Sequence, residues 1–204
     1  AKVLGNNKDG IDFSLEDDYY GDTRFHIPFI AWYQVMNASL ALTTMEVLKD
    51  RIPVTMEQLQ AGIANTRWQG RMETILPGVI VDGAHNEDGV RRFVETAERF
   101  QKEYPLTLLF SAVNDKDYQD MIHTICSRIK FRKVVTTEVG GYREVPSAEL
   151  AEIFCKEGCK DIGNSDNIEE AFHMAHEAKG EDGMLFCVGS LYLVGEIKTL
   201  LLKK

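Results

Sequence analysis

The sequence predicts an α/β fold in which residues 67–204 form a Rossmann-like, three-layer domain with a mostly parallel sheet. From residue 71 onward, short apolar runs alternate with segments whose apolar residues recur at helical spacing. This alternation of strand and helix is typical of a parallel sheet with helices on both faces. Residues 1–66 lack it, and residues 67–73 interrupt the periodicity. We therefore expect a domain boundary at residues 66/67.

The expected elements of the second domain follow one another along the chain. Strands are expected at residues 72–75, 79–82, 106–113, 133–137, 161–162 and 184–188. Helices are expected at residues 87–101, 118–129, 147–156, 167–178 and 190–202.

The first domain is expected to contain strands followed by two helices. Residues 1–27 are polar, with short apolar pieces at 11–13 and 25–27 that indicate strands. A helix is expected from Pro28 to about residue 50, because apolar residues recur at helical spacing and proline suits a first turn. A second helix is expected from Thr55 to about residue 65, since Thr-Met-Glu-Gln forms a capping box.

Composition limits the classes of function. A net charge of −9 disfavours a broad nucleic-acid surface, although a nucleotide needs only a few local donors. We find no apolar run long enough to span a bilayer and no leader sequence, so we expect a cytoplasmic protein without membrane contact. The four cysteines are too scattered for a disulfide framework, and Cys155 and Cys159 lack a second pair for zinc. Free thiols and no metal site are expected.

The stretch G-V-I-V-D-G-A-H-N at residues 78–86 indicates a functional site. It predicts a buried strand, a tight loop and a helix, which places Asp82 and His85 beyond the carboxyl end of the strand. Open α/β sheets bind ligands there, and a nucleotide is the leading interpretation. Asp-Gly between apolar runs also suits a hairpin or a plain turn. The helical pattern after residue 86 argues against a hairpin, but a plain turn stays open.

Two more predicted strand ends carry polar residues. Lys116 follows the strand at 106–113 and offers a cation for an anionic group. Ser190 follows the strand at 184–188 and begins a helix, where free N–H groups and the hydroxyl suit a carboxylate or phosphate. Each has a simpler interpretation, an exposed loop charge for Lys116 and a helix cap for Ser190. Three polar strand ends at one edge together favour a shared site.

Gln34 and Asn37 lie three residues apart in the first expected helix. Both side chains carry a donor and an acceptor, which suits the edge of an adenine, but these residues alone favour the simpler interpretation that Asn37 satisfies local backbone groups. The sequence contains no G-x-x-x-x-G-K-[ST] phosphate loop and no G-x-S-x-G nucleophile elbow. This chain therefore does not carry a complete P-loop ATPase.

Five motifs together resemble one enzyme family. They are Y-Q-x-x-N-A at 33–38, R-W-Q-G-R-M-E at 67–73, V-D-G-A-H-N at 81–86, D-K-D at 115–117 and G-S-L-Y-L at 189–193. Their order and spacing, from about residue 29 to residue 202, resemble folylpolyglutamate synthase and its bifunctional dihydrofolate synthase relatives in the Mur ligase superfamily. Tyr33 departs from the histidine that often precedes the glutamine, and Gln69 stands where proline or alanine is commoner.

The resemblance implies an ATP-dependent amide-forming ligase. In this family ATP phosphorylates the terminal carboxylate of a folate, and the amine of L-glutamate attacks the acyl phosphate. The complete enzyme has an N-terminal P-loop ATPase domain, with the Mg²⁺ ligands, and a C-terminal Rossmann-like domain. Residues 1–66 resemble the end of the first domain and residues 67–204 the whole of the second. The resemblance thus implies a truncated chain that is inactive alone and part of a full-length monomer.

The resemblance also assigns roles to individual residues. The amides of Gln34 and Asn37 would contact adenine, Asp82 the ribose hydroxyls, Arg71 the ribose and phosphates, and His85, Lys116 and Ser190 the incoming glutamate. Two alternatives stay open, a muramyl-peptide ligase C-terminal domain and a non-catalytic nucleotide-binding module. An exposed apolar face on residues 1–66 would indicate a missing domain and argue against the module.

Overall fold

The computed structural model describes residues 1–7, 10–141 and 144–202, which belong to two compact units. Unit 1 comprises Ala1–Gln69 and unit 2 comprises Gly70–Lys204. Each unit has its own sheet and its own hydrophobic cluster. None of the described helices is both long enough and apolar enough to span a membrane.

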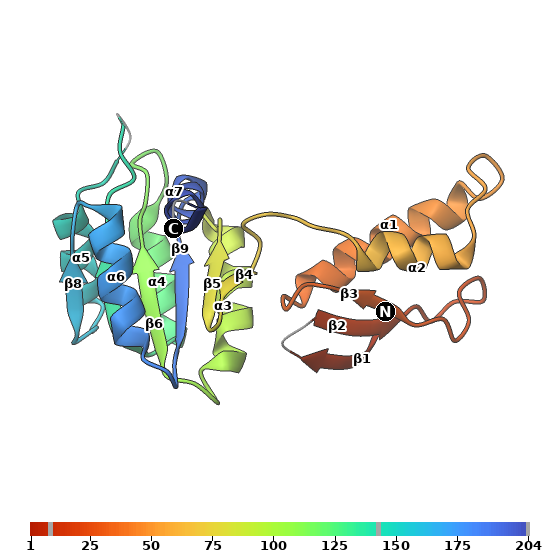
Figure 1. Cartoon of the computed structure of the whole chain (residues 1–204), viewed down its shortest axis with the longest axis horizontal. Helices are drawn as coiled ribbons and strands as arrows, with labels where there is room; N and C mark the ends of the chain where they lie inside the picture. Colours follow the sequence, from red (N-terminus) through yellow and green to blue (C-terminus); the bar gives the residue numbers. More distant parts are fainter. Residues whose placement is uncertain (8–9, 142–143, 203–204) are drawn as a thin grey trace. The chain divides into compact units, whose positions relative to one another are not determined.

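Unit 1 is a small antiparallel sheet covered by two helices. Its strands β1 (Lys2–Asn7), β2 (Gly10–Ser14) and β3 (Phe25–Ile27) pair in the order β1-β2-β3. Helices α1 (Tyr33–Val47) and α2 (Met56–Ala64) lie along one face of this sheet (Figure 1). Apolar side chains from the sheet and both helices form one cluster between them.

The expected start of the first helix is wrong by five residues. The helix begins at Tyr33 and not at Pro28, and β3 ends directly before this proline at Ile27. Residues 29–31 are buried in a non-helical segment that links the sheet to the helix. The capping box of α2 is confirmed, since the Thr55 hydroxyl accepts from the Gln58 N–H at 3.2 Å and the Gln58 side chain accepts from the Thr55 N–H at 2.8 Å.

Unit 2 contains a six-stranded sheet in the order β4-β5-β9-β6-β7-β8. The strands are β4 (Glu73–Leu76), β5 (Val79–Asp82), β6 (Leu106–Phe110), β7 (Phe131–Thr136), β8 (Ile162–Asn164) and β9 (Met184–Val188). Only β4, which pairs with β5, runs antiparallel among the described strands of this sheet. The predicted, mostly parallel sheet is confirmed.

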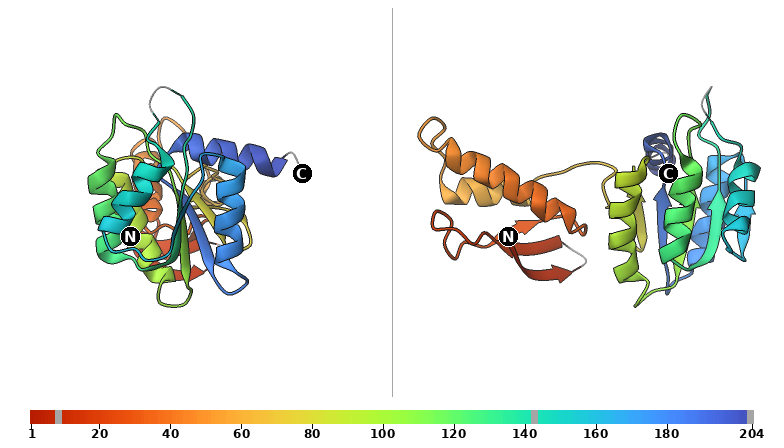
Figure 2. Two further views of the ribbon diagram at one scale, coloured as in Figure 1. Left: turned by 90° about the vertical axis from the view of Figure 1, so that its left-hand side faces the viewer. Right: turned by 180° about the vertical axis from the view of Figure 1, so that it is seen from behind.

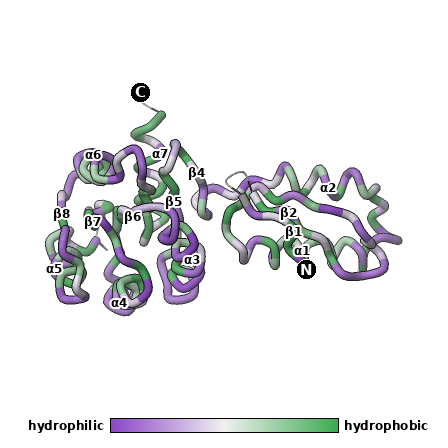
Figure 3. Tube along the Cα trace, turned by 90° about the horizontal axis from the view of Figure 1, so that it is seen from below, coloured by the Kyte–Doolittle hydropathy of each residue, from purple (hydrophilic) through white to green (hydrophobic). Residues whose placement is uncertain are grey.

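Helices cover both faces of this sheet and create three layers. They are α3 (Glu87–Phe100), α4 (Tyr118–Arg128), α5 (Ser147–Lys156), α6 (Ile168–Lys179) and α7 (Leu191–Leu202). Helices α3, α4 and α5 pack on one face, and α6 and α7 on the other (Figures 2 and 3). Every residue of β5 and β6 is buried, as expected for strands covered on both faces. The predicted Rossmann-like fold is confirmed.

Strand β6 ends at Phe110, three residues earlier than the sequence predicted. The backbone of Val113 has left the ladder and forms an isolated antiparallel bridge with Glu144. The loop that carries Lys116 therefore begins directly at the carboxyl edge of the sheet.

Candidate functional site

Three loops of unit 2 begin side by side at one edge of its sheet. In the parallel ladder, Asp82 of β5 lies opposite Val188 of β9, and Val188 lies opposite Phe110 of β6. Helices α3 and α4 continue from β5 and β6 on one face, whereas α7 continues from β9 on the other (Figure 3). Ligands of open α/β sheets bind where neighbouring connections diverge in this way. The edge beside Asp82 is therefore the candidate site.

The Asp82 carboxylate is buried, with 3% of the residue exposed. Its Oδ2 accepts from the Met72 N–H and its Oδ1 from the Ala84 N–H, both at 2.8 Å. Burial raises the pKa of Asp82 to about 6, against the opposing effect of these two hydrogen bonds and of the charges of Arg71 and His85. Asp82 thus joins the end of β5 to the segment before β4, a structural role that was not expected from the sequence.

The segment before β4 is held at several points. The Gly70 carbonyl accepts from the Gly83 N–H at 2.8 Å, and the Gly70 N–H donates to Glu73 Oε2 at 2.7 Å. Lys198 of α7 reaches the same Glu73 carboxylate with N–O distances of 2.7 and 3.0 Å. Among the described residues other than glycine, only Met72 has a positive φ, 46°. Its N–H bond to Asp82 helps to hold this strained backbone, and Arg71 lies within the fixed segment.

The loop after Asp82 packs against the start of α7. A Cβ atom on Gly83 would lie 2.2 Å from Leu191 Cδ2, so a larger residue at this position would force the exposed Leu191 side chain to move. His85 is half-buried, and its Nδ1 lies 2.7 Å from the Gly83 carbonyl oxygen. Since a carbonyl accepts, the hydrogen is on Nδ1 and Nε2 is left as an acceptor when the ring is neutral. Asn86 caps α3 by accepting from the Gly89 N–H at 2.9 Å.

Ser190 lies where the simpler interpretation placed it, at the start of α7. The residue is 2% exposed, and its Oγ accepts from the Tyr192 N–H at 3.1 Å. Its hydroxyl hydrogen can still be donated, because the backbone contact uses only a lone pair of the oxygen.

Lys116 is exposed and lines a pocket between the loops that follow β5 and β6. The described residues that line it are Asn86, Glu87, Asp115, Lys116, Asp117, Asp120 and Met121. Lys116 is thus surrounded by carboxylates. Four carboxylates face one lysine here, so the net charge of the pocket favours an ammonium group, and Lys116 is its one described cation.

Gln34 and Asn37 belong to unit 1, whereas the five other predicted site residues belong to unit 2. Gln34 is 3% exposed and Asn37 is exposed. The Asn37 Nδ2 donates to Gln34 Oε1 at 2.8 Å, so the two amides act as one hydrogen-bonded pair on the first turns of α1.

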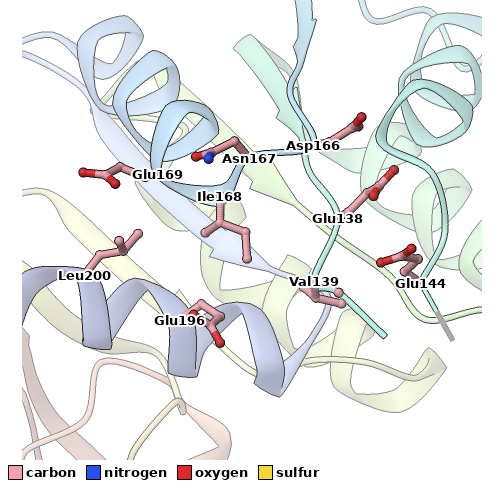
Figure 4. A pocket seen from close by; sticks show the side chains of 10 residues that line it. Glu138, Val139, Glu144, Asp166, Asn167, Ile168, Glu169, Glu196 and Leu200 are labelled. Carbon is pink, nitrogen blue, oxygen red and sulfur yellow. The ribbon is translucent and has the colours of Figure 1, made fainter. Parts of the chain in front are cut away.

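A second, acidic pocket at the carboxyl edge of unit 2 was not expected from the sequence. The carboxylates of Glu138, Glu144, Asp166, Glu169 and Glu196 surround it, with Val139, Ile168 and Leu200 between them (Figure 4). Burial and the nearby charges of Asp166 and Glu144 raise the pKa of Glu138. Within the described ranges, no three His, Cys, Asp or Glu side chains converge to hold a metal ion. The pocket residues come from distant segments, and no motif links them.

Comparison with known proteins identifies the family. Residues 70–191 match the family model described as Mur ligase, glutamate ligase domain, which is more than half of the chain. The chain belongs to the Mur ligase family. The matched residues run from the first residue of unit 2 to the start of α7, and they include the whole carboxyl edge on which Asp82, Lys116 and Ser190 lie.

Individual relatives of this Mur ligase chain belong to the folate branch. The dihydrofolate synthase/folylpolyglutamate synthase of Bacillus subtilis (strain 168) is 30% identical over 194 residues, covering 91% of this chain and 43% of that protein. The crystal structure of Mycobacterium tuberculosis folylpolyglutamate synthase complexed with ADP and AMPPCP has a TM-score of 0.78 at 24% identity. The matched region covers 97% of this chain and 47% of the Mycobacterium tuberculosis chain.

A muramyl-peptide enzyme matches less of the chain. The UDP-N-acetylmuramoyl-L-alanyl-D-glutamate–2,6-diaminopimelate ligase of Caldanaerobacter subterraneus subsp. tengcongensis is 25% identical over 122 residues, covering 57% of this chain and 24% of that protein. The resemblance to folylpolyglutamate and dihydrofolate synthases that the motifs predicted is confirmed. The chain spans less than half the length of each of these relatives.

Proposed function

We propose that this chain is the C-terminal portion of an ATP-dependent ligase that joins L-glutamate to a reduced folate through an acyl phosphate. The observation that carries the proposal is the match with the Bacillus subtilis dihydrofolate synthase/folylpolyglutamate synthase, which extends over both units. The muramyl-peptide ligase covers only 57% of this chain, and this favours a folate over a muramyl-peptide substrate.

The proposed nucleotide contacts are Asp82 and Arg71 in unit 2 and an amide pair in unit 1. A carboxylate has about four lone-pair sites, and Asp82 uses two of them for backbone N–H groups, which leaves capacity for two ribose hydroxyls. The charge of Arg71 acts to lower the pKa of Asp82, and its guanidinium would bind phosphate oxygens. In unit 1, the bonded pair Gln34 and Asn37 would read the adenine edge.

The proposed glutamate contacts are His85, Lys116 and Ser190. Lys116 would hold a glutamate carboxylate as a point charge, and the Ser190 hydroxyl would donate a hydrogen bond to the same carboxylate. The His85 Nε2 would accept a hydrogen bond from the amino group. The carboxylates around Lys116 would favour the amino group of the same substrate. Both charges of an amino acid are thereby accommodated.

The apolar face of α1 supports a missing partner domain. Met36, Leu40 and Val47 are 63%, 70% and 78% exposed, and such a face on a helix requires cover. We propose that residues 1–66 are the last part of a central ATPase domain whose remainder supplies the phosphate loop and the Mg²⁺ ligands. The same face argues against a stand-alone nucleotide-binding module.

Replacing Asp82 in the full-length protein tests the nucleotide role. Asp82→Ala should raise the KM for ATP about 10- to 100-fold, because charge-assisted hydrogen bonds of roughly 1.5–3 kcal/mol are lost. Asp88→Ala, which removes an exposed carboxylate on α3, is the matched control. Unchanged ATP kinetics in a variant with native circular dichroism would refute the assignment.

The chain alone provides a separate test of the truncated organisation. It should not ligate glutamate to tetrahydrofolate in the presence of ATP and Mg²⁺, because phosphoryl transfer depends on a positioned phosphate loop and metal. Turnover by residues 1–204 would contradict the proposal that the ATPase part lies elsewhere.

A further inference from the structure

Two cysteines of unit 2 lie next to each other on neighbouring elements. Cys126 is in the last turn of α4, and Cys159 follows the end of α5. Their Sγ atoms are 3.6 Å apart although 33 residues separate them in the chain. Both side chains are partly exposed. We propose that Cys126 and Cys159 form a reversible disulfide that links α4 to the end of α5, with a low-molecular-weight disulfide as the oxidant.

The local structure favours this bond. A disulfide has an S–S distance of about 2.05 Å, so the two sulfurs must approach by about 1.5 Å for the bond to form. A second contact holds the same two elements at this spacing, since His123 Nδ1 of α4 lies 2.9 Å from Glu157 Oε2. Cys159 directly follows an exposed turn at residues 157–158, in which Gly158 has a φ of +92°.

The other two cysteines differ in their surroundings. Cys187 is fully buried in β9, and burial raises the pKa of its thiol. Cys155 is exposed on α5. The hydrogen bond between the pair lowers the pKa of Cys159 and raises that of Cys126, so Cys159 forms the thiolate more readily.

The exchange proceeds in two balanced steps. The Cys159 thiolate attacks one sulfur of the small disulfide, breaks its S–S bond and releases one thiolate, which takes up a proton. Cys126 then loses its proton to water, and its thiolate attacks the Cys159 sulfur of the mixed disulfide. The Cys126–Cys159 bond forms and the second small thiolate leaves. Two protein thiols are oxidised by two electrons, and one small disulfide is reduced to two thiols.

The bond would stabilise the fold in an oxidised environment without touching the candidate ligase site. It closes a loop of 33 residues and so restricts the unfolded chain. Cys126 lies at the end of α4 remote from Lys116, which precedes its first turn. The proposal therefore does not rest on the proposed function.

Oxidised glutathione is the probe for the experiment. Treatment of the folded chain should remove the free thiols of Cys126 and Cys159, and dithiothreitol should restore them. Trypsin places the four cysteines in different peptides, because Arg128, Arg143, Lys156 and Lys160 lie between or beside them. Mass spectrometry should then detect peptide 117–128 joined to peptide 157–160. The oxidised chain should also melt roughly 5–10 °C higher than the reduced chain.

Matched variants decide the outcome. Cys126→Ser and Cys159→Ser should each abolish the linked peptide and the rise in melting temperature, whereas Cys155→Ser should retain both. Mixed glutathione adducts without an internal bond would overturn the proposal. A bond between Cys155 and Cys159 in place of the expected one would overturn it equally.

Discussion

Substitution of Asp82 by asparagine should change how the stability of unit 2 depends on pH. The asparagine keeps the shape of the side chain but has no ionisable group. Its amide nitrogen must face either the Met72 or the Ala84 N–H, which costs about 1–3 kcal/mol. Loss of the buried charge offsets this cost, so the absolute stability at neutral pH should change little.

The pH dependence has a definite sign. Burial raises the pKa of Asp82 in the folded chain from 3.8 to about 6, so the protonated form favours folding. The stability that this group contributes is therefore complete below pH 3.8 and is lost as the pH rises through about 6. The difference of about two units between the unfolded and folded pKa values corresponds to about 3 kcal/mol of folding free energy in total. About 2 kcal/mol of this should be lost between about pH 4.5 and about pH 7.5.

Urea unfolding followed by circular dichroism across this pH range measures the effect. The free energy of unfolding of the native chain minus that of Asp82→Asn should fall by about 2 kcal/mol from the acidic to the neutral end. The exposed Asp88→Asn should give a curve parallel to that of the native chain. Equal pH dependence in the native and Asp82→Asn chains would refute the interpretation that Asp82 is a buried, destabilised carboxylate.

Two further substitutions test the packing around the candidate site. Gly83→Ala should lower the free energy of unfolding by about 1 kcal/mol, because the Leu191 side chain must move away from the added Cβ. Gly195→Ala, on the open face of α7, should raise the free energy of unfolding by about 0.5–1 kcal/mol. A similar loss of stability in both variants would contradict this account. Lys198→Met should cost about 1 kcal/mol, since it removes a half-buried partner of Glu73, and the cost should shrink in a Glu73→Gln background. An equal cost in both backgrounds would show that the pair does not interact.

The sequence predicted the layers of unit 2 well because its elements have strong periodicity. The runs at β5 and β9 and the apolar stripe of α3 depend on local spacing, which a single sequence displays. Local spacing failed at Pro28, because the apolar residues 29–31 are buried in a non-helical link between β3 and α1. Their burial gives an apolar pattern without a helix.

The candidate site was predicted only as a set of strand ends. The strand order brings Asp82, Val188 and Phe110 together, and alternation of strand and helix was enough to expect this. The two N–H bonds to Asp82 and the acidic pocket around Glu138 were missed, because they depend on how separate loops fold against each other. The contact between Cys126 and Cys159 was missed for the same reason.

The full-length protein allows the most direct test of the central claim. Incubation with ATP, Mg²⁺, radiolabelled L-glutamate and tetrahydrofolate should yield a labelled folate with one additional glutamate and one ADP per amide bond formed. Glutamate transfer that requires the folate and ATP together would support the account. ATP-dependent ligation of a muramyl peptide, with no labelled folate at any ATP concentration, would contradict it.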